Sequence, residues 1–243
     1  MMNTIDAGDS VAIAIVDAIQ HGDLATLHRL LAEHPGLATC RIAAGDPGGS
    51  QRTLLHIVTD WPGHFPNGAE TVKALVAAGA EVNARFVGAH RETPLHWAAS
   101  CDDVAVLDAL LDAGADIDAA GAVIGGGTPL ADATAFKQWR VAHRLVERGA
   151  RVTLSDAATL GLADRLEAMF AAEAAPDHEA IDGAFWCACH GGQRDAAEYL
   201  LERGADLNWL APWEPMTPLD AAARGEYDEL VAWLQARGAR SAA

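Results

Sequence analysis

The sequence predicts an all-α solenoid of about seven stacked helix-turn-helix repeats, with hairpin loops, here called fingers, between neighbouring repeats. Three observations support this fold class. A complete helical hairpin occupies residues 93–119 and recurs in altered form on both sides. The interval from Gly79 to Gly114 equals that from Gly114 to Gly149. Apolar residues follow helical spacing. Such a chain buries its core between successive repeats, and we expect one elongated domain over residues 1–243.

Residues 93–119 show the repeat most clearly. Thr93 can cap a helix whose first turn holds Pro94, which lacks only an amide hydrogen that has no partner there. Gly114 ends a second helix, since glycine adopts the left-handed conformation that helix ends often need. Neither helix can bury its apolar face alone. The apolar stripe of the second helix contains Val104, Leu107, Leu110 and Leu111.

The start Thr-Pro-Leu-His, the pair Ala98-Ala99, the double leucine and the end Gly-Ala-Asp are similar to an ankyrin repeat. This resemblance covers nearly the whole chain. It implies a curved stack of antiparallel helix pairs with protruding fingers, in a family used mostly for holding partner proteins. The resemblance does not name the partner.

The same pattern sets the repeat boundaries. We expect an N-terminal capping repeat at 11–38 and a C-terminal capping repeat at 217–240, because a terminal repeat meets water on one side. A long loop, rich in Gly, Ala, Asp and Pro, is expected over 36–51. A degenerate repeat without a clear finger is expected at 155–175. Further repeats are expected at 53–84, 93–119, 128–152 and 183–208, of which the first departs from the pattern because it carries an insertion between its helices.

Charge excludes some classes of partner. The chain has 17 basic and 34 acidic residues, a formal charge of -17, which disfavours binding to nucleic acid or to an anionic membrane surface. The acidity has two interpretations, the solubility of an alanine-rich protein and a basic protein partner.

The compartment is predicted from the first residues and the cysteines. The start lacks a basic leader, and Asp17 interrupts its apolar run, so we expect neither a secretory signal nor a spanning helix. Four cysteines lie scattered without the pattern of a disulfide scaffold, which is typical of reduced thiols. The expected localisation is cytoplasmic.

Histidine and cysteine side chains are the candidate metal ligands of this sequence. His56 and His96 occupy the Thr-x-Leu-His position, and the resemblance implies that they join neighbouring repeats by hydrogen bonds, so we interpret both as structural. The run 187–190, Cys-Ala-Cys-His, has the wrong spacing for zinc, since residues two apart on a helix point in different directions. We expect buried thiols at Cys187 and Cys189, and neither a metal nor a cofactor.

The sequence AGAVIGGG at 120–127 precedes a predicted helix. Its amides could face an anion, but the Lys-Ser/Thr that completes a nucleotide-binding loop is missing. We interpret it as a tight hairpin, in which glycine permits positive backbone angles. Asp132 and Asp220, early on first helices, are interpreted as solvated carboxylates.

Candidate partner-binding residues lie on predicted fingers, loops and first helices, where large or polar side chains can anchor an interface. The insertion 60–68 carries Trp61 and either contacts a partner or folds back on its own repeat. Trp97 is assigned to the core. The candidates are Trp61, His90, Glu92, Phe136, Trp186, His190, Trp209 and Trp213.

The expected function is a non-catalytic protein–protein interaction module that binds a protein partner through its concave groove and its fingers. No motif pairs a nucleophile with a base, so no catalytic residue is assigned. The alternative is a small-molecule or enzymatic pocket in the C-terminal half. Such a pocket would lie between the glycine-rich finger and Trp186, His190, Trp209 and Trp213.

Overall fold

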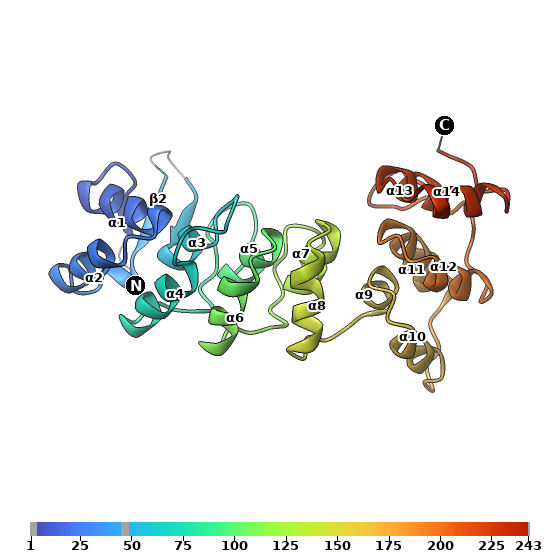
Figure 1. The fold of residues 1–243 in the computed structure, drawn as a ribbon, viewed down its shortest axis with the longest axis horizontal. Helices are drawn as coiled ribbons and strands as arrows, with labels where there is room; N and C mark the ends of the chain where they lie inside the picture. Colours follow the sequence, from blue (N-terminus) through green and yellow to red (C-terminus); the bar gives the residue numbers. More distant parts are fainter. Residues whose placement is uncertain (1–3, 45–48, 243) are drawn as a thin grey trace. The chain divides into compact units, whose positions relative to one another are not determined.

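The computed structural model describes residues 4–44 and 49–242, and this part of the chain forms seven pairs of α-helices (Figure 1). The predicted fold class is therefore confirmed. The chain divides into two compact units, an N-terminal unit of residues 1–150 and a C-terminal unit of residues 151–243. One continuous domain over the whole chain stays a prediction. Across the described residues, every helix is too short or too polar to cross a membrane.

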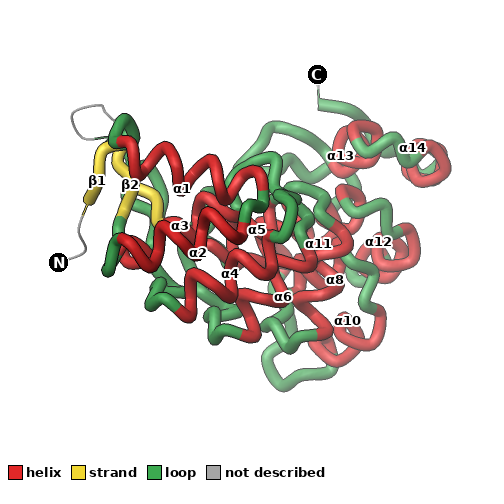
Figure 2. Tube along the Cα trace, turned by 60° about the vertical axis from the view of Figure 1, so that its left-hand side comes forward, coloured by secondary structure: helices red, strands yellow, loops and turns green. Residues whose placement is uncertain are grey.

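The N-terminal unit stacks four helix pairs. The first helices pack in one row and the second helices in another, as Figure 2 shows for α1, α3 and α5 beside α2, α4 and α6. Leucines such as Leu55, Leu95 and Leu130 are fully buried between consecutive repeats. The helices are α1 (Ser10–His21), α2 (Leu24–Glu33), α3 (Leu54–Val58), α4 (Gly68–Ala77), α5 (Pro94–Ser100), α6 (Val104–Asp112), α7 (Pro129–Ala135) and α8 (Trp139–Glu147).

Threonine caps fix where the first helices begin. Thr53, Thr93 and Thr128 all have extended backbone and are each the residue before the helix, and proline follows at the first helical position in α5 and α7. The Thr-Pro start was predicted from the sequence and is confirmed in both helices.

A small three-stranded sheet lies at the N-terminal end of this unit (Figure 2). β2 (Arg41–Ala43) pairs in parallel with β1 (Thr4–Asp6) and antiparallel with β3 (Gln51–Thr53). The prediction of a plain loop over 36–51 is therefore wrong, although 45–48 lie outside the described residues. Ile42 of β2 is buried. Because β3 continues directly into α3, the sheet connects the N-terminal cap to the second repeat. Strands of three residues are too short to show an alternating pattern.

The C-terminal unit contains α9 (Leu154–Thr159), α10 (Ala163–Phe170), α11 (His178–His190), α12 (Arg194–Leu201), α13 (Pro218–Arg224) and α14 (Asp228–Gln235). Helix α11 packs against α9 and α13, with Phe185 fully buried in their core. It begins earlier than the repeat pattern predicts because Asp177 caps it, accepting a hydrogen bond from the amide of Ala180 at 2.9 Å.

The glycine-rich finger is a tight hairpin, as predicted. Gly121, Gly125 and Gly126 have φ angles of 130°, 63° and 70°, a region that side chains disfavour. The amide of Ala122 donates to the carbonyl of Gly127 at 3.0 Å, which closes the hairpin directly before α7.

Candidate functional site

A cleft of about 470 Å³ opens in the N-terminal unit between two neighbouring fingers and the loop that follows α3. The loop contributes Trp61, the finger before α5 contributes His90 and Glu92, and helix α5 contributes Trp97. The finger before α7 and the end of α7 complete the lining with Val123, Phe136 and Gln138.

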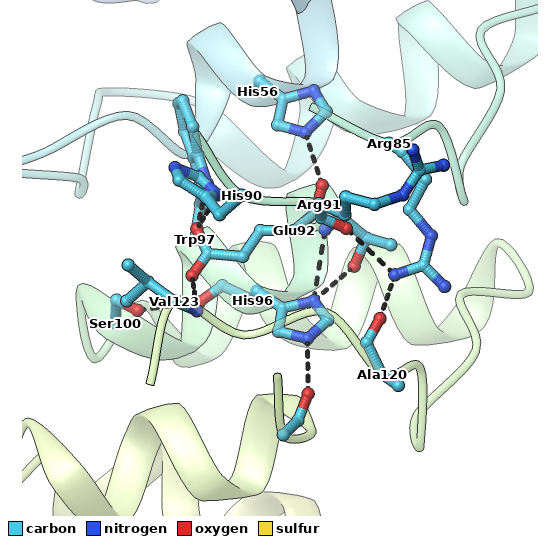
Figure 3. Close-up of polar contacts among 12 residues, drawn as sticks. His56, Arg85, His90, Arg91, Glu92, His96, Trp97, Ser100, Ala120 and Val123 are labelled. Atoms are coloured by element: carbon cyan, nitrogen blue, oxygen red, sulfur yellow. Dashed lines mark hydrogen bonds and ion pairs between the residues drawn. The ribbon is translucent and has the colours of Figure 1, made fainter. Parts of the chain in front are cut away.

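Glu92 holds this cleft together (Figure 3). Its residue is only 5% exposed. One carboxylate oxygen accepts a hydrogen bond from the indole Nε1–H of Trp97 at 2.7 Å, and the other accepts from the amide of Val123 at 2.7 Å. The Nδ1 atom of His90 lies 3.0 Å from the same carboxylate. The glycine-rich finger therefore does present an amide to an anion, but the anion is an internal carboxylate.

Aromatic rings pack behind this carboxylate. His90 stacks on Phe86 with ring centroids 4.4 Å apart and an interplanar angle of 17°. Trp97 meets the edge of His56 at 4.9 Å and 78°, and lies 5.4 Å from Phe86. Trp97 is half-buried, so it packs between repeats as predicted and also lines the cleft.

Asp132 is completely buried, so the interpretation of its side chain as solvated is wrong. No N–H donor among the described residues reaches its oxygens, and the carboxyl faces Glu92. Burial, and then the charge of Glu92, raises the pKa of Asp132 well above its ordinary value. The low-dielectric surroundings and the neighbouring carboxylate both disfavour a charge on Asp132. Asp220, in contrast, is half-exposed and caps α13 from within its first turn.

His56 and His96 join consecutive repeats, as predicted (Figure 3). The Nε2 of His56 donates to the carbonyl of Glu92 at 3.3 Å, and that of His96 donates to the carbonyl of Gly127 at 3.4 Å. Their Nδ1 atoms lie 2.8 and 2.9 Å from the hydroxyls of Thr53 and Thr93. Only a ring with a proton on Nε2 can bond a carbonyl in this way.

Burial lowers the pKa of both imidazoles. The pKa of His56 falls to about 3, because burial disfavours the charged ring and outweighs the hydrogen bond to Glu92. Burial lowers the pKa of His96 in the same direction. Both rings are therefore neutral structural bridges at neutral pH.

The second group of predicted site residues forms a tryptophan cluster in the C-terminal unit, composed of Trp186, His190, Trp209 and Trp213. Trp186 stacks on His190 at 5.4 Å and 10°, and meets Trp213 edge-on at 5.6 Å. Trp209 meets Trp213 at 5.3 Å. Trp186 and His190 are 5% and 7% exposed, whereas Trp213 is 56% exposed. The buried pair supports an exposed indole.

Trp186 performs the bridging role of the histidines. Its indole Nε1–H donates to the carbonyl of Met216 at 3.1 Å. Met216 directly precedes the capping Thr217, just as Glu92 and Gly127 precede Thr93 and Thr128. Counting back from Gly204 as from Gly114 puts Trp186 at the repeat position of His96. Sequence reasoning nevertheless assigned Trp186 to partner contact and missed this structural role.

The eight predicted site residues thus fall into two groups. Trp61, His90, Glu92 and Phe136 come together in the cleft, and the other four form the tryptophan cluster. Their part in binding a partner stays a prediction. Sequence reasoning did not include Val123, Trp97 or Gln138 in the cleft. Of these, Trp97 carried a signal, since its indole follows the histidine of the repeat motif and needs a polar partner.

The arrangement of the C-terminal unit bears on the predicted small-molecule pocket. The four residues of the tryptophan cluster pack on one another and over Gly183, where an added Cβ would lie 3.7 Å from Trp213 and 3.9 Å from Trp209. Cavities of about 390 and 300 Å³ in this unit are lined by other residues, including Tyr199 in the first and Tyr227 in the second.

The Cys-Ala-Cys-His run lies inside α11. Cys189 is buried and Cys187 is half-buried, and burial raises the pKa of the Cys187 thiol to about 11. Burial also raises the pKa of Cys189. The predicted burial is therefore found for Cys189. A search of residues 4–44 and 49–242 finds no group of three or more His, Cys, Asp or Glu side chains placed to hold a metal ion.

Stacked helix pairs, threonine-capped first helices and finger loops define the chain as a helical repeat protein. Residues 15–121 and 67–156 match the family model described as Ankyrin repeats (3 copies), and residues 183–210 match the one described as Ankyrin repeat. These matches cover more than half of the 243 residues, and the chain belongs to the ankyrin-repeat family. Proteins of this family are generally protein–protein interaction modules.

Solved structures are also similar to this chain, and one of them is a human ankyrin repeat domain. The chain is similar to the human ASB11 ankyrin repeat domain, with 29% identity, 78% of this chain and 85% of that chain covered, and a TM-score of 0.47. None of the curated proteins matches this chain in sequence.

Proposed function

We propose that this chain is a non-catalytic binding module that engages a protein partner through exposed aromatic side chains on its loops and fingers. One observation carries the proposal. Trp61 is 82% exposed, although an indole is among the costliest side chains to leave in water. An exposed tryptophan on an ordered surface is typical of an interface anchor.

The loop that carries Trp61 is firmly anchored. The amide of His64 donates to Asp103 at 2.9 Å, and its Nε2 bonds the carbonyl of Cys101 at 2.9 Å. The side-chain amide of Asn67 donates to the carbonyl of Gly22 at 2.9 Å. The loop is thus folded back on neighbouring repeats while its indole faces solvent. A preformed surface of this kind loses little conformational entropy on binding.

Other exposed apolar side chains support the same function. Phe136 is 42% exposed at the rim of the cleft, and Val123 is 55% exposed on the adjoining finger. In the C-terminal unit the finger before α13 exposes Leu210 and Trp213 by 52% and 56%. Each unit therefore offers its own aromatic contact surface.

The formal charge of -17 favours a partner with a basic surface, because opposite charge accelerates encounter and selects against acidic competitors. We place the protein in the cytoplasm as part of this proposal. Its four cysteines are free thiols, which are typical of a reducing compartment.

Affinity capture from native cytosol tests the proposal. Four forms of the full chain would be used as bait: the parent, Trp61→Ala, Trp213→Ala and the control His143→Ala, which changes an exposed residue of α8. We expect a protein that the parent and the control retain equally and that at least one tryptophan variant retains about tenfold less. Titration of that purified protein by calorimetry would then confirm direct binding.

All variants must first show the same thermal unfolding as the parent, so that lost capture reports contact rather than folding. If every captured protein were retained equally by the parent and both tryptophan variants, the proposed binding surface would be wrong. A small molecule that co-purifies with the parent, in the absence of any protein partner, would replace this proposal with the small-molecule alternative.

A further inference from the structure

The cleft of the N-terminal unit combines two features that a plain packing surface does not need. Its volume of about 470 Å³ is large enough for a long side chain with its neighbouring backbone. Its interior contains a carboxylate that is almost entirely removed from solvent, since the side chain of Glu92 is only 6% exposed.

The charge in the cleft has no cationic side chain to balance it permanently. None of the described residues that line the cleft is lysine or arginine. Arg85, one of the two arginines labelled in Figure 3, donates hydrogen bonds to the carbonyls of Arg91 and Ala120. Glu92 accepts hydrogen bonds from the neutral N–H groups of Trp97 and Val123, and the imidazole Nδ1 of His90 lies 3.0 Å from the same carboxylate. A buried carboxylate without a permanent counterion favours binding of a positive group.

A second acidic group lies behind the first. Asp132 is fully buried, and it lies close enough to Glu92 for that carboxylate to contribute to the raised pKa of Asp132. Asp60 adds a carboxylate at the edge of the cleft, but it is paired with Arg52. The free attraction for a cation is therefore concentrated at Glu92.

The walls suit a flat cation. Trp61, Trp97 and Phe136 line the cleft together with Glu92, so aromatic rings and a carboxylate occur in the same cavity. Cations bind favourably over the faces of aromatic rings, and a guanidinium also stacks on them as a planar group. It presents several N–H donors in a fixed fork that matches a carboxylate, and it loses less hydration than an ammonium.

We propose that this cleft binds an arginine side chain of the protein partner, with the guanidinium at Glu92 and its stem against Trp61 and Phe136. This inference rests on the proposed function and specifies the chemistry of one of its contact surfaces. The opposite charges of the partner and the cleft are the feature that selects arginine over a neutral side chain.

The test uses the full chain and a blocked Gly-Arg-Gly tripeptide, acetylated and amidated so that only the side chain is charged. Binding is followed by the indole N–H resonances in a ¹H–¹⁵N spectrum, assigned with Trp61→Phe and Trp97→Phe variants. We expect saturable shifts of Trp61 and Trp97. A Gly-Gln-Gly tripeptide should bind about tenfold or more weakly, because it cannot engage the carboxylate as a cation. Higher salt should weaken the binding of the arginine peptide, because it screens the attraction between the guanidinium and the carboxylate.

Two variants locate the site. Glu92→Gln keeps the shape but removes the charge, and Trp61→Ala removes one wall without affecting the core. Each variant should lower the affinity for the Gly-Arg-Gly tripeptide about tenfold. The control His143→Ala changes an exposed residue of α8 and should leave binding unchanged. If Glu92→Gln fails to fold, the affinity of Trp61→Ala for the tripeptide and the salt dependence of binding still test the proposed site.

Equal binding of the Gly-Gln-Gly peptide, or an equal loss of binding with His143→Ala, would overturn the proposal. A Gly-Lys-Gly peptide that bound as tightly as the arginine peptide would overturn the choice of arginine. If no tripeptide binds while Trp61→Ala still abolishes protein capture, the arginine site fails and the proposed function stands. If the arginine tripeptide binds as expected but no protein is captured in a tryptophan-dependent way, the arginine site stands and the proposed function fails.

Discussion

The cleft of the N-terminal unit and the tryptophan cluster of the C-terminal unit join a first helix to the following finger in different ways. In the cleft, small bridging rings at His56 and His96 leave room, and the carboxylate of Glu92 fastens the next finger through Val123. In the cluster, the larger Trp186 makes the bridge itself, and Trp213 packs against it. The residue at one repeat position therefore differs between the two sites: it is histidine beside the acidic cleft and tryptophan in the apolar cluster.

The comparison predicts that Trp186 is the most important single bridge. Trp186→Ala removes a buried indole together with its hydrogen bond to the carbonyl of Met216, so we expect a loss of about 3–5 kcal/mol in the free energy of unfolding. Urea denaturation followed by circular dichroism measures it. Trp186→His, which restores a ring N–H donor, should lose less. A loss under about 1 kcal/mol for Trp186→Ala would show that this bridge is not structural.

The neutral bridges of the N-terminal unit predict sensitivity to acid. The pKa of His56 is about 3 in the folded chain and 6.5 as its ordinary value, so its contribution is fully present above about pH 6.5 and declines as the pH falls toward 3. The slope is up to about 1.4 kcal/mol per pH unit for one proton. His96 acts in the same direction.

Replacing the ring separates this effect from others. His56→Gln should cost about 2 kcal/mol at neutral pH, because the carbonyl of Glu92 loses a well-placed donor, and should make the decline between pH 6.5 and 4 shallower by about one proton. Urea denaturation over this range measures both. The exposed His143→Ala is the matched control. An unchanged slope in His56→Gln would contradict the assignment of this bridge as a neutral ring.

Asp132 predicts a smaller effect of opposite sign. Its raised pKa means that its contribution is greatest below the ordinary value of 3.8 and is lost as the pH rises through the folded-state pKa. Asp132→Asn keeps a donor toward Glu92 without a proton to lose, so we expect about 1–2 kcal/mol more stability at neutral pH and little change near pH 4. Thermal unfolding at both pH values measures it. If Asp132→Asn were less stable than the parent at neutral pH, the carboxyl group of Asp132 would be more favourable beside Glu92 than an amide.

The exposed tryptophans should matter least for folding. Trp61→Ala should change the free energy of unfolding by no more than about 0.5 kcal/mol, since most of its indole is in water. Trp213→Ala should cost somewhat more, up to about 1 kcal/mol, because its ring also contacts Trp186 and Trp209. Calorimetric melting of both variants checks this order. A reversed order would show that the loop of Trp61 depends on its indole.

The repetitive parts of the fold were predictable because they depend on local signals. A Thr-Pro start, an apolar stripe and a terminal glycine each act within one repeat, and the described residues form seven helix pairs, although α11 begins at His178, earlier than the pattern predicts. The bridging role of His56 and His96 also followed from the repeated motif. The strands around Ile42 were missed, because they form only through pairing between distant segments.

The candidate sites were less predictable than the fold. The sequence indicated aromatic residues on loops, but the burial of Asp132 depends on Glu92, which lies one repeat away. The same is true of the amide of Val123, which reaches that carboxylate from the next finger. Contacts of this kind depend on how consecutive fingers are stacked. A pattern within a single repeat does not contain that information.

The most direct test of the binding proposal is photocrosslinking at Trp61 in native cytosol. A benzophenone amino acid would replace Trp61 in one sample and His143 in another, so that both probes are exposed but only the first lies at the cleft. The account predicts a discrete crosslinked protein at position 61, reduced by Glu92→Gln and absent at position 143. The same crosslinked proteins at both positions, with no effect of Glu92→Gln, would contradict it.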